Sequence, residues 1–321
     1  MRKITMITLI LLFLINLLPV QIFGRELVAV GQVVGLQLQD GTLTVAAFDE
    51  ELGKSAKEAG LAVGDKILHI DGRAVQGTDD IRQALAASKG VVTMEVLRGN
   101  QRVRVKFEPV ITDEGPKLGL YLKQGVTGVG TITWYDGENN TIGTLGHGVN
   151  NANGQLLKLE QGNIYETAVV SVRKGKSGEP GQLMGSILSK DPIGTVTANT
   201  PQGVFATTQQ PWTGQTMETA SWEEIKTGPA TMLSTVSGTQ VGQYQVEILK
   251  IYPKSTQAGR NLLIRITDPT LLEQTGGIVQ GMSGSPIIQN GKLVGAVTHV
   301  LVNDPTRGYG IFIENMLQAA G

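Results

Sequence analysis

The chain has 321 residues, which is enough for about two domains, and its 27 basic residues nearly balance its 28 acidic ones, so the formal net charge is −1. This balance provides no basic field to attract nucleic acid, and nucleic acid is not expected as a partner. The lack of cysteine excludes disulfides and thiolate metal sites, and the three histidines are dispersed, so no metal and no cofactor are expected.

Residues 1–24 have the pattern of a targeting segment. Arg2 and Lys3 precede a mostly apolar run from Ile7 to Val20. This is the order of a signal peptide, and the run is short for a full membrane span. A cleaved signal peptide and a retained membrane anchor both fit, and both place the rest of the chain across the cytoplasmic membrane. An exported chain without cysteine fits a bacterial protein.

Residues 27–110 are predicted to form one α+β unit. Strand-like runs alternate with glycine turns, and Asp71-Gly72 is a strong turn signal. Thr78 begins a helix whose apolar stripe includes Ile81 and Leu85. His69 lies within a strand-like run, and we expect it to be structural.

The stretch SAKEAGLAVGDKILHIDGRAV, residues 55–75, closely resembles the PDZ domains of bacterial proteases. The resemblance implies that an extended peptide binds by strand addition between the second strand and the helix, near Ile81 and Leu85. The segment Gly35-Leu36-Gln37-Leu38 stands where such domains carry the loop that binds the ligand's carboxylate. A PDZ module that only packs against its neighbour is the competing interpretation.

Residues 117–321 follow an expected linker at Asp113 to Pro116 and show short apolar runs separated by glycine, asparagine and aspartate. Several strands at this spacing predict a β-sandwich or a barrel. Helical periodicity returns at Ile313 to Ala320, where a short terminal helix is expected.

The hexapeptide Gly281-Met282-Ser283-Gly284-Ser285-Pro286 lies between two apolar runs. A turn there exposes the Ser283 hydroxyl and aims the N–H groups of Gly281 and Ser283 at one point, so one loop supplies a nucleophile and an oxyanion hole. Gly-x-Ser-Gly-x-Pro is typical of chymotrypsin-like proteases. A structural glycine turn is the alternative, and Ser285 fits the nucleophile less well because Pro286 leads it into the next strand.

A serine nucleophile needs a base and a group that orients the base. His147, flanked by glycines, precedes Ser283 by 283 − 147 = 136 residues, which suits two successive barrels. His299 follows Ser283 by 299 − 283 = 16 residues and is expected to line the pocket or to be structural. Spacing does not choose the orienting acid, for which the candidates are Glu166, Asp191, Glu247, Asp268 and Glu273. Asp268 ends an apolar run before the serine, although an aspartate before proline is also a common turn cap.

The PDZ-like unit, the sequence GTLGHGV and the sequence from Ile266 to Leu317 together closely resemble the stage IV sporulation protein B peptidases of spore-forming Firmicutes. The resemblance implies a mainly β chain, with a PDZ domain followed by a chymotrypsin-like double β-barrel peptidase domain over residues 117–321. By motif it implies His147 as the base, Ser283 as the nucleophile and Asp268 as the acid.

The same resemblance implies a secreted or membrane-anchored serine endopeptidase that acts between the two membranes around the developing forespore. Its implied substrate is a membrane-bound regulatory complex, whose cleavage releases processing of the mother-cell sigma factor. Its PDZ domain is expected to control activity by binding a peptide, possible ligands including the chain's own N-terminal segment. The rival function is a secreted PDZ adaptor with an inactive protease-like scaffold, and the intact pair of His147 and Ser283 argues against it.

Overall fold

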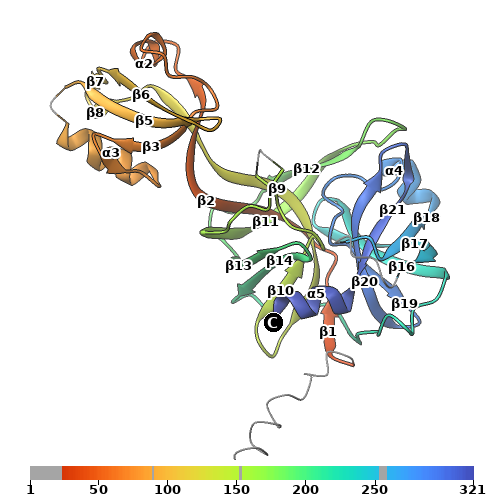
Figure 1. Cartoon of the computed structure of the whole chain (residues 1–321). Coiled ribbons are helices and arrows are strands. Elements are labelled where there is room, and N and C mark those ends of the chain that lie inside the picture. The colour runs from red at the N-terminus through yellow and green to blue at the C-terminus, as the bar shows by residue number, and fades with distance from the viewer. Residues whose placement is uncertain (1–23, 89, 152–153, 253–258) are drawn as a thin grey trace, which may run out of the picture.

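The structure is a computed structural model that describes residues 24–88, 90–151, 154–252 and 259–321. The predicted leader therefore lies outside the described residues, apart from Gly24. The chain is mainly β, as predicted, and it forms a small N-terminal unit joined to a larger body of two barrels (Figure 1).

The first barrel has six strands and closes because β9 pairs with both β2 and β10. Its strands are β2 (Val33–Phe48), β9 (Leu120–Asp136), β10 (Thr141–Thr144), β11 (Gln161–Arg173), β13 (Gly194–Thr200) and β14 (Gly203–Thr208). Inward-facing apolar side chains such as Val34, Ile132 and Ile164 fill its interior. Three short strands border it, namely β1 (Glu26–Ala29), β12 (Gln182–Ile187) and β15 (Gln215–Glu218).

The second barrel also closes with six strands, in the order β16-β17-β18-β21-β20-β19. These are β16 (Gly228–Ser237), β17 (Gln240–Ile251), β18 (Leu262–Ile266), β19 (Pro286–Gln289), β20 (Lys292–Leu301) and β21 (Asp304–Phe312). Helix α4 (Pro269–Thr275) follows β18, and α5 (Ile313–Ala320) ends the chain as predicted. An apolar cluster that includes Trp134, Phe205 and Met316 joins α5 to both barrels. Two antiparallel barrels in succession are the predicted double β-barrel arrangement.

The N-terminal unit contains helices α2 (Lys54–Glu58) and α3 (Thr78–Ala87) packed on a small sheet. Besides parts of β2 and β9, its strands are β3 (Lys66–Ile70), β4 (Arg73–Ala74), β5 (Val92–Arg98), β6 (Gln101–Phe107), β7 (Val110–Thr112) and β8 (Gly115–Lys117). Its core begins at Leu43 and includes Leu118, with Leu120 and Leu122 packed against it.

The predicted boundaries of this unit are therefore wrong at both ends. Residues Glu26 to Leu38 pair with strands of the first barrel and not with the small sheet. The expected linker at Asp113 to Pro116 is part of the hairpin formed by β7 and β8. The physical reason is that β2 and β9 are long strands, so each belongs to the small sheet along one half and to the barrel along the other (Figure 1).

Candidate active site

The turn that carries Ser283 lies between α4 and β19, and glycine geometry shapes it. Gly281 and Gly284 have φ angles of +98° and +95°, which favour glycine, and a Cβ on Gly284 would overlap the carbonyl oxygen of Thr131. The Gly284 N–H donates to Val297 O over 2.8 Å, and the side chain of Met282 is fully buried. These contacts hold the turn in place, with the Ser283 side chain at the surface of a cleft.

Strand β9 of the first barrel holds this turn at three points. The Thr131 N–H donates to Ser283 O over 2.9 Å, and Thr131 Oγ1 donates to Gly281 O over 2.8 Å. Thr133 Oγ1 donates to Gly284 O over 2.7 Å. These bonds fix the carbonyl groups of the turn. The N–H groups of Gly281 and Ser283 have no acceptor among the hydrogen bonds of the described residues. Two free N–H groups on either side of Met282 suit an oxyanion hole, and their role as one stays a prediction.

His147 reaches the same cleft from the other barrel. It follows β10 through Leu145 and Gly146, which both have a φ of +67°. A Cβ on Gly146 would lie 2.8 Å from Thr298 Cγ2, so the two barrels meet closely at this glycine. His147 and Ser283 line one cleft of about 610 Å3. The structure thus brings together the predicted base and the predicted nucleophile, although they are 136 residues apart in the sequence.

The environment of His147 defines its chemistry. Its Nδ1 lies 2.9 Å from Gly148 O, and because a carbonyl oxygen can only accept, Nδ1 carries the proton and Nε2 keeps a free lone pair. Burial lowers the pKa of His147, and this effect exceeds the opposing one of the Gly148 hydrogen bond. The ring is therefore a neutral base at neutral pH. The Ser283 hydroxyl donates to Thr298 O over 2.8 Å, so in this rotamer its proton points at that carbonyl and not at His147.

His299 lies beside His147, with ring centroids 5.1 Å apart and the planes tilted by 39°. It lines the cleft, as the sequence led us to expect. Burial lowers its pKa to about 4, and His147 and Arg260 contribute further by charge. His299 is therefore neutral at neutral pH and contributes no positive charge to the cleft.

The structure places Asp268 elsewhere. Its carboxylate caps α4: Oδ1 accepts from the Leu271 N–H over 3.0 Å, and Oδ2 accepts from the Gln245 N–H over 3.3 Å. It does not line the cleft of His147 and Ser283, and no carboxylate is found among the described residues that do. The turn-cap alternative thus describes the observed contacts, and the role of Asp268 as the acid stays a prediction.

Asn199, on β13, fixes the segment that follows His147. The sequence did not indicate this role. Its Oδ1 accepts from the Val149 N–H over 2.8 Å, and its Nδ2 donates to Val149 O and Leu157 O over 2.9 and 2.8 Å. Val149 is two residues beyond His147, so Asn199 positions the backbone that binds the imidazole. The one signal in the sequence was an asparagine within a strand-like run, where this residue is uncommon.

The prediction that the segment Gly35-Leu36-Gln37-Leu38 binds the carboxylate of a PDZ ligand is wrong. These residues lie inside β2 and pair with β11 on one side and β9 on the other, so their backbone groups are used in the barrel. Leu36 and Leu38 are buried and line the cleft of His147 and Ser283 instead. A strand followed by a glycine is common to the PDZ loop and to a barrel strand, which explains the error.

A groove in the N-terminal unit runs between α3 and the start of β9. Ile81 and Leu85 line it, as predicted, and the opposite wall comes from Leu118 to Leu122. Gly119, with a φ of +64°, turns the chain into β9 there, and the segment Leu118-Gly119-Leu120-Tyr121 has the glycine between apolar residues that we sought at Gly35. This segment is the part of the groove that sequence reasoning missed.

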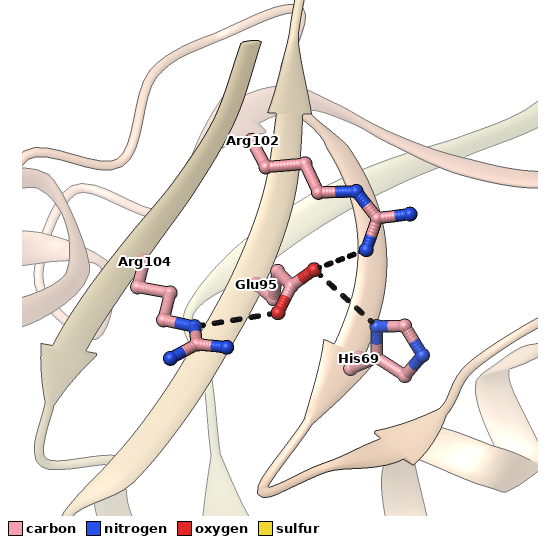
Figure 2. Close-up of polar contacts among 4 residues, drawn as sticks. All are labelled: His69, Glu95, Arg102 and Arg104. Carbon is pink, nitrogen blue, oxygen red and sulfur yellow. Dashed lines mark hydrogen bonds and ion pairs between the residues drawn. The ribbon is translucent and has the colours of Figure 1, made fainter.

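The third histidine lies away from both sites. His69 belongs to a polar cluster on the small sheet, 3.9 Å from the carboxylate of Glu95, which also binds Arg102 and Arg104 (Figure 2). The hydrogen bond from Arg102, ahead of the one from Arg104, lowers the pKa of Glu95. The structural role expected for His69 agrees with this position.

Two family models match the chain. The model of the SpoIVB peptidase S55 family matches residues 114–317, and a PDZ domain model matches residues 53–98. The chain belongs to the SpoIVB peptidase S55 family. It combines an S55 peptidase-family domain with a PDZ domain, and the cleft of His147 and Ser283 is the candidate active site of the S55 domain.

The S55 peptidase is also similar to individual proteins. It is 32% identical over 83 residues to a protein of Clostridium perfringens (strain 13 / Type A) described as a zinc metalloprotease, a match that spans about a quarter of either chain, 26% of this one and 25% of the other. Among solved structures, the active form of the Rv3671c protease of M. tuberculosis has 16% identity and a TM-score of 0.35, covering 74% of this chain and 82% of that one. The thermostable serine protease AL20 of an extremophilic microorganism has 13% identity and a TM-score of 0.35, covering 65% and 93%.

The described residues hold no group of three or more histidine, aspartate or glutamate side chains placed to bind a metal ion. The helices within the described ranges are all too short or too polar to span a bilayer.

Proposed function

We propose that this S55 peptidase is an exported enzyme of sporulation, which cleaves a membrane-associated regulatory protein and whose activity is set by a peptide in its PDZ groove. The observation that supports the chemistry is the shared cleft of His147 and Ser283 beside two free N–H groups. The family supports the biological setting. The apolar N-terminal run supports export to the space between the two membranes around the forespore, in anchored or released form.

The proposed reaction is acyl transfer to water. Nε2 of His147 takes the Ser283 proton while Oγ attacks the peptide carbonyl carbon. The N–H groups of Gly281 and Ser283 stabilise the negative oxygen, each such donor contributing roughly 3 kcal/mol. The protonated imidazole then gives its proton to the leaving amine, and water, activated by the same His147, releases the acyl group and regenerates Ser283.

Labelling with a fluorophosphonate probe distinguishes the proposed enzyme from the rival function, a PDZ adaptor with an inactive protease-like scaffold. The full wild-type chain is expected to form an adduct on Ser283. The variant Ser283→Ala should form no adduct, and His147→Ala should form far less than the wild type when circular dichroism shows that both are equally folded. A folded wild-type chain that forms no adduct would support the adaptor.

Strand β9 supports the proposed control by the PDZ groove. Its first residues, Leu120 to Leu122, form one wall of the groove, and its residues Thr131 and Thr133 hold the nucleophile turn. A ligand added beside the start of β9 therefore acts on the same strand that positions the oxyanion hole. The ligand is proposed to be a peptide end from the substrate complex or from the chain's own N-terminal segment.

The control is tested with the full chain, because the groove needs residues beyond the predicted PDZ boundary. A synthetic peptide of residues 12–24 is titrated while the rate of fluorophosphonate labelling is followed. The rate is expected to change saturably, and the change should be lost in Leu85→Arg, which fills the groove. A labelling rate independent of peptide concentration would contradict control by this segment while leaving the peptidase assignment intact.

A further inference from the structure

A second cleft adjoins the catalytic one, on the outside of the first barrel. It measures about 770 Å3 and is bounded by β2, β9, β11 and β12. Leu36, Gly128 and Val129 line both clefts, so the two clefts border each other at these residues of β2 and β9. We name it the ribbon cleft, after the two-stranded ribbon of β11 and β12 (Figure 1).

The ribbon carries large apolar side chains that are exposed to solvent. Ile187 is 55% exposed and Leu188 is 53% exposed, and both line the ribbon cleft. Ile187 lies next to Gly35, where an added Cβ would be 3.5 Å from Ile187 Cγ1, and Gly185 also lines the cleft. Adjacent large apolar side chains at the edge of a cleft are typical of a binding surface.

Strand β12 also offers backbone groups to a ligand. Within the described ranges its strand partner is β11, and its other edge has a single bridge, from Gln182 to Gln280. Gln280 lines the catalytic cleft three residues before Ser283. From Met184 to Ile187 this edge carries no further strand partner in the described part of the chain, and an extended peptide can pair with such an edge.

We propose that the ribbon cleft binds an extended apolar segment of the polypeptide substrate, several residues away from the bond that is cleaved. A chain whose carbonyl lies at Ser283 passes Gly128 and Val129 and enters the ribbon cleft, where its apolar side chains cover Ile187 and Leu188. This inference rests on the peptidase activity of the same site and adds a specificity-determining surface to it.

The test measures how well β-casein, an unfolded and apolar polypeptide, protects Ser283 of the full chain from a fluorophosphonate. The double variant Ile187→Asp/Leu188→Asp is expected to need about tenfold more casein for half-protection, because two charges replace the apolar contact. Its labelling rate without casein is expected to equal that of the wild type, because neither residue touches His147 or the turn. Val170→Asp is the matched control, since Val170 is 65% exposed on the same ribbon but lines neither cleft.

Unchanged protection in the double variant would overturn the proposal, as would equal weakening in Val170→Asp or a wild type that casein does not protect. Failure of the peptidase assignment is separate, because it would remove labelling of the wild type in the absence of casein.

Discussion

At the scale of single residues, His147 is set up as a base by burial and by one carbonyl group. Burial lowers its pKa, so the imidazole stays neutral to a lower pH than an ordinary histidine. The labelling rate of Ser283 should therefore rise with pH through a midpoint below about 6.5, the ordinary histidine value. A stopped-time labelling series between pH 4 and 9 measures this midpoint, and a value above the ordinary one would contradict the account.

Asn199 carries the second prediction at this scale. Asn199→Ala removes all three hydrogen bonds to the segment after His147, whereas Asn199→Asp keeps an acceptor for the Val149 N–H and loses both donors. Both variants should lower the labelling rate, Asn199→Ala by about tenfold or more, equivalent to roughly 1.4 kcal/mol. The pH midpoint of Asn199→Ala should also move up, because a loosened segment admits water to His147. An unchanged rate and midpoint would show that Asn199 does not position the base.

Substitutions of Asp268 distinguish a structural role of its carboxylate from a catalytic one. As the cap of α4 it should contribute about 1 kcal/mol to the free energy of unfolding, so Asp268→Ala should be less stable by that amount in urea denaturation. Asp268→Asn keeps an oxygen for capping and should restore most of the stability. If Asp268 acts only as a cap, Asp268→Asn labels at the wild-type rate. A large loss of rate in a stable Asp268→Asn would instead favour the acid role that the family motif implies.

At the scale of elements, β9 is the support of the nucleophile turn. Thr131→Val keeps the shape of the side chain and leaves the buried Gly281 carbonyl without its hydroxyl donor, which should cost about 1–3 kcal/mol of stability. It should also slow labelling of Ser283. Thr208→Val is a matched control, because Thr208 is buried and donates to Ile193 O over 2.7 Å in the same barrel, away from the turn. Equal labelling rates in the two variants would argue against a special role for β9.

The elements also show how far the sequence could predict the structure. Gly281, Ser283 and His147 lie in local patterns whose chemistry follows from a few adjacent residues, and the structure brings them to one cleft. Asn199 could not be predicted, because its partners Val149 and Leu157 lie 50 and 42 residues earlier in the sequence and meet it only in the folded chain. The groove segment at Leu118 was missed because it follows α3 in the chain, whereas we sought it before the helix, at Gly35.

At the scale of the whole molecule, the PDZ unit and the first barrel share β2 and β9, so they are not independent domains joined by a linker. A fragment of residues 25–112 lacks Leu118 and the start of β9, which complete the PDZ core, and it exposes the barrel half of β2. We expect this fragment to be unfolded, with little dispersion in its amide NMR spectrum. A well-dispersed spectrum would show that the unit folds without β9 and would weaken the proposed link between groove and active site.

The central claim is that the two barrels bring His147 and Ser283 together as one catalytic unit, and it is tested most directly by β-casein cleavage in a double-mutant cycle. Ser283→Ala, His147→Ala and the variant with both changes should fall to one common background rate, because residues that act as a unit lose their effect together. Substantial cleavage by Ser283→Ala, or losses in the two single variants that add in the double variant, would contradict the account.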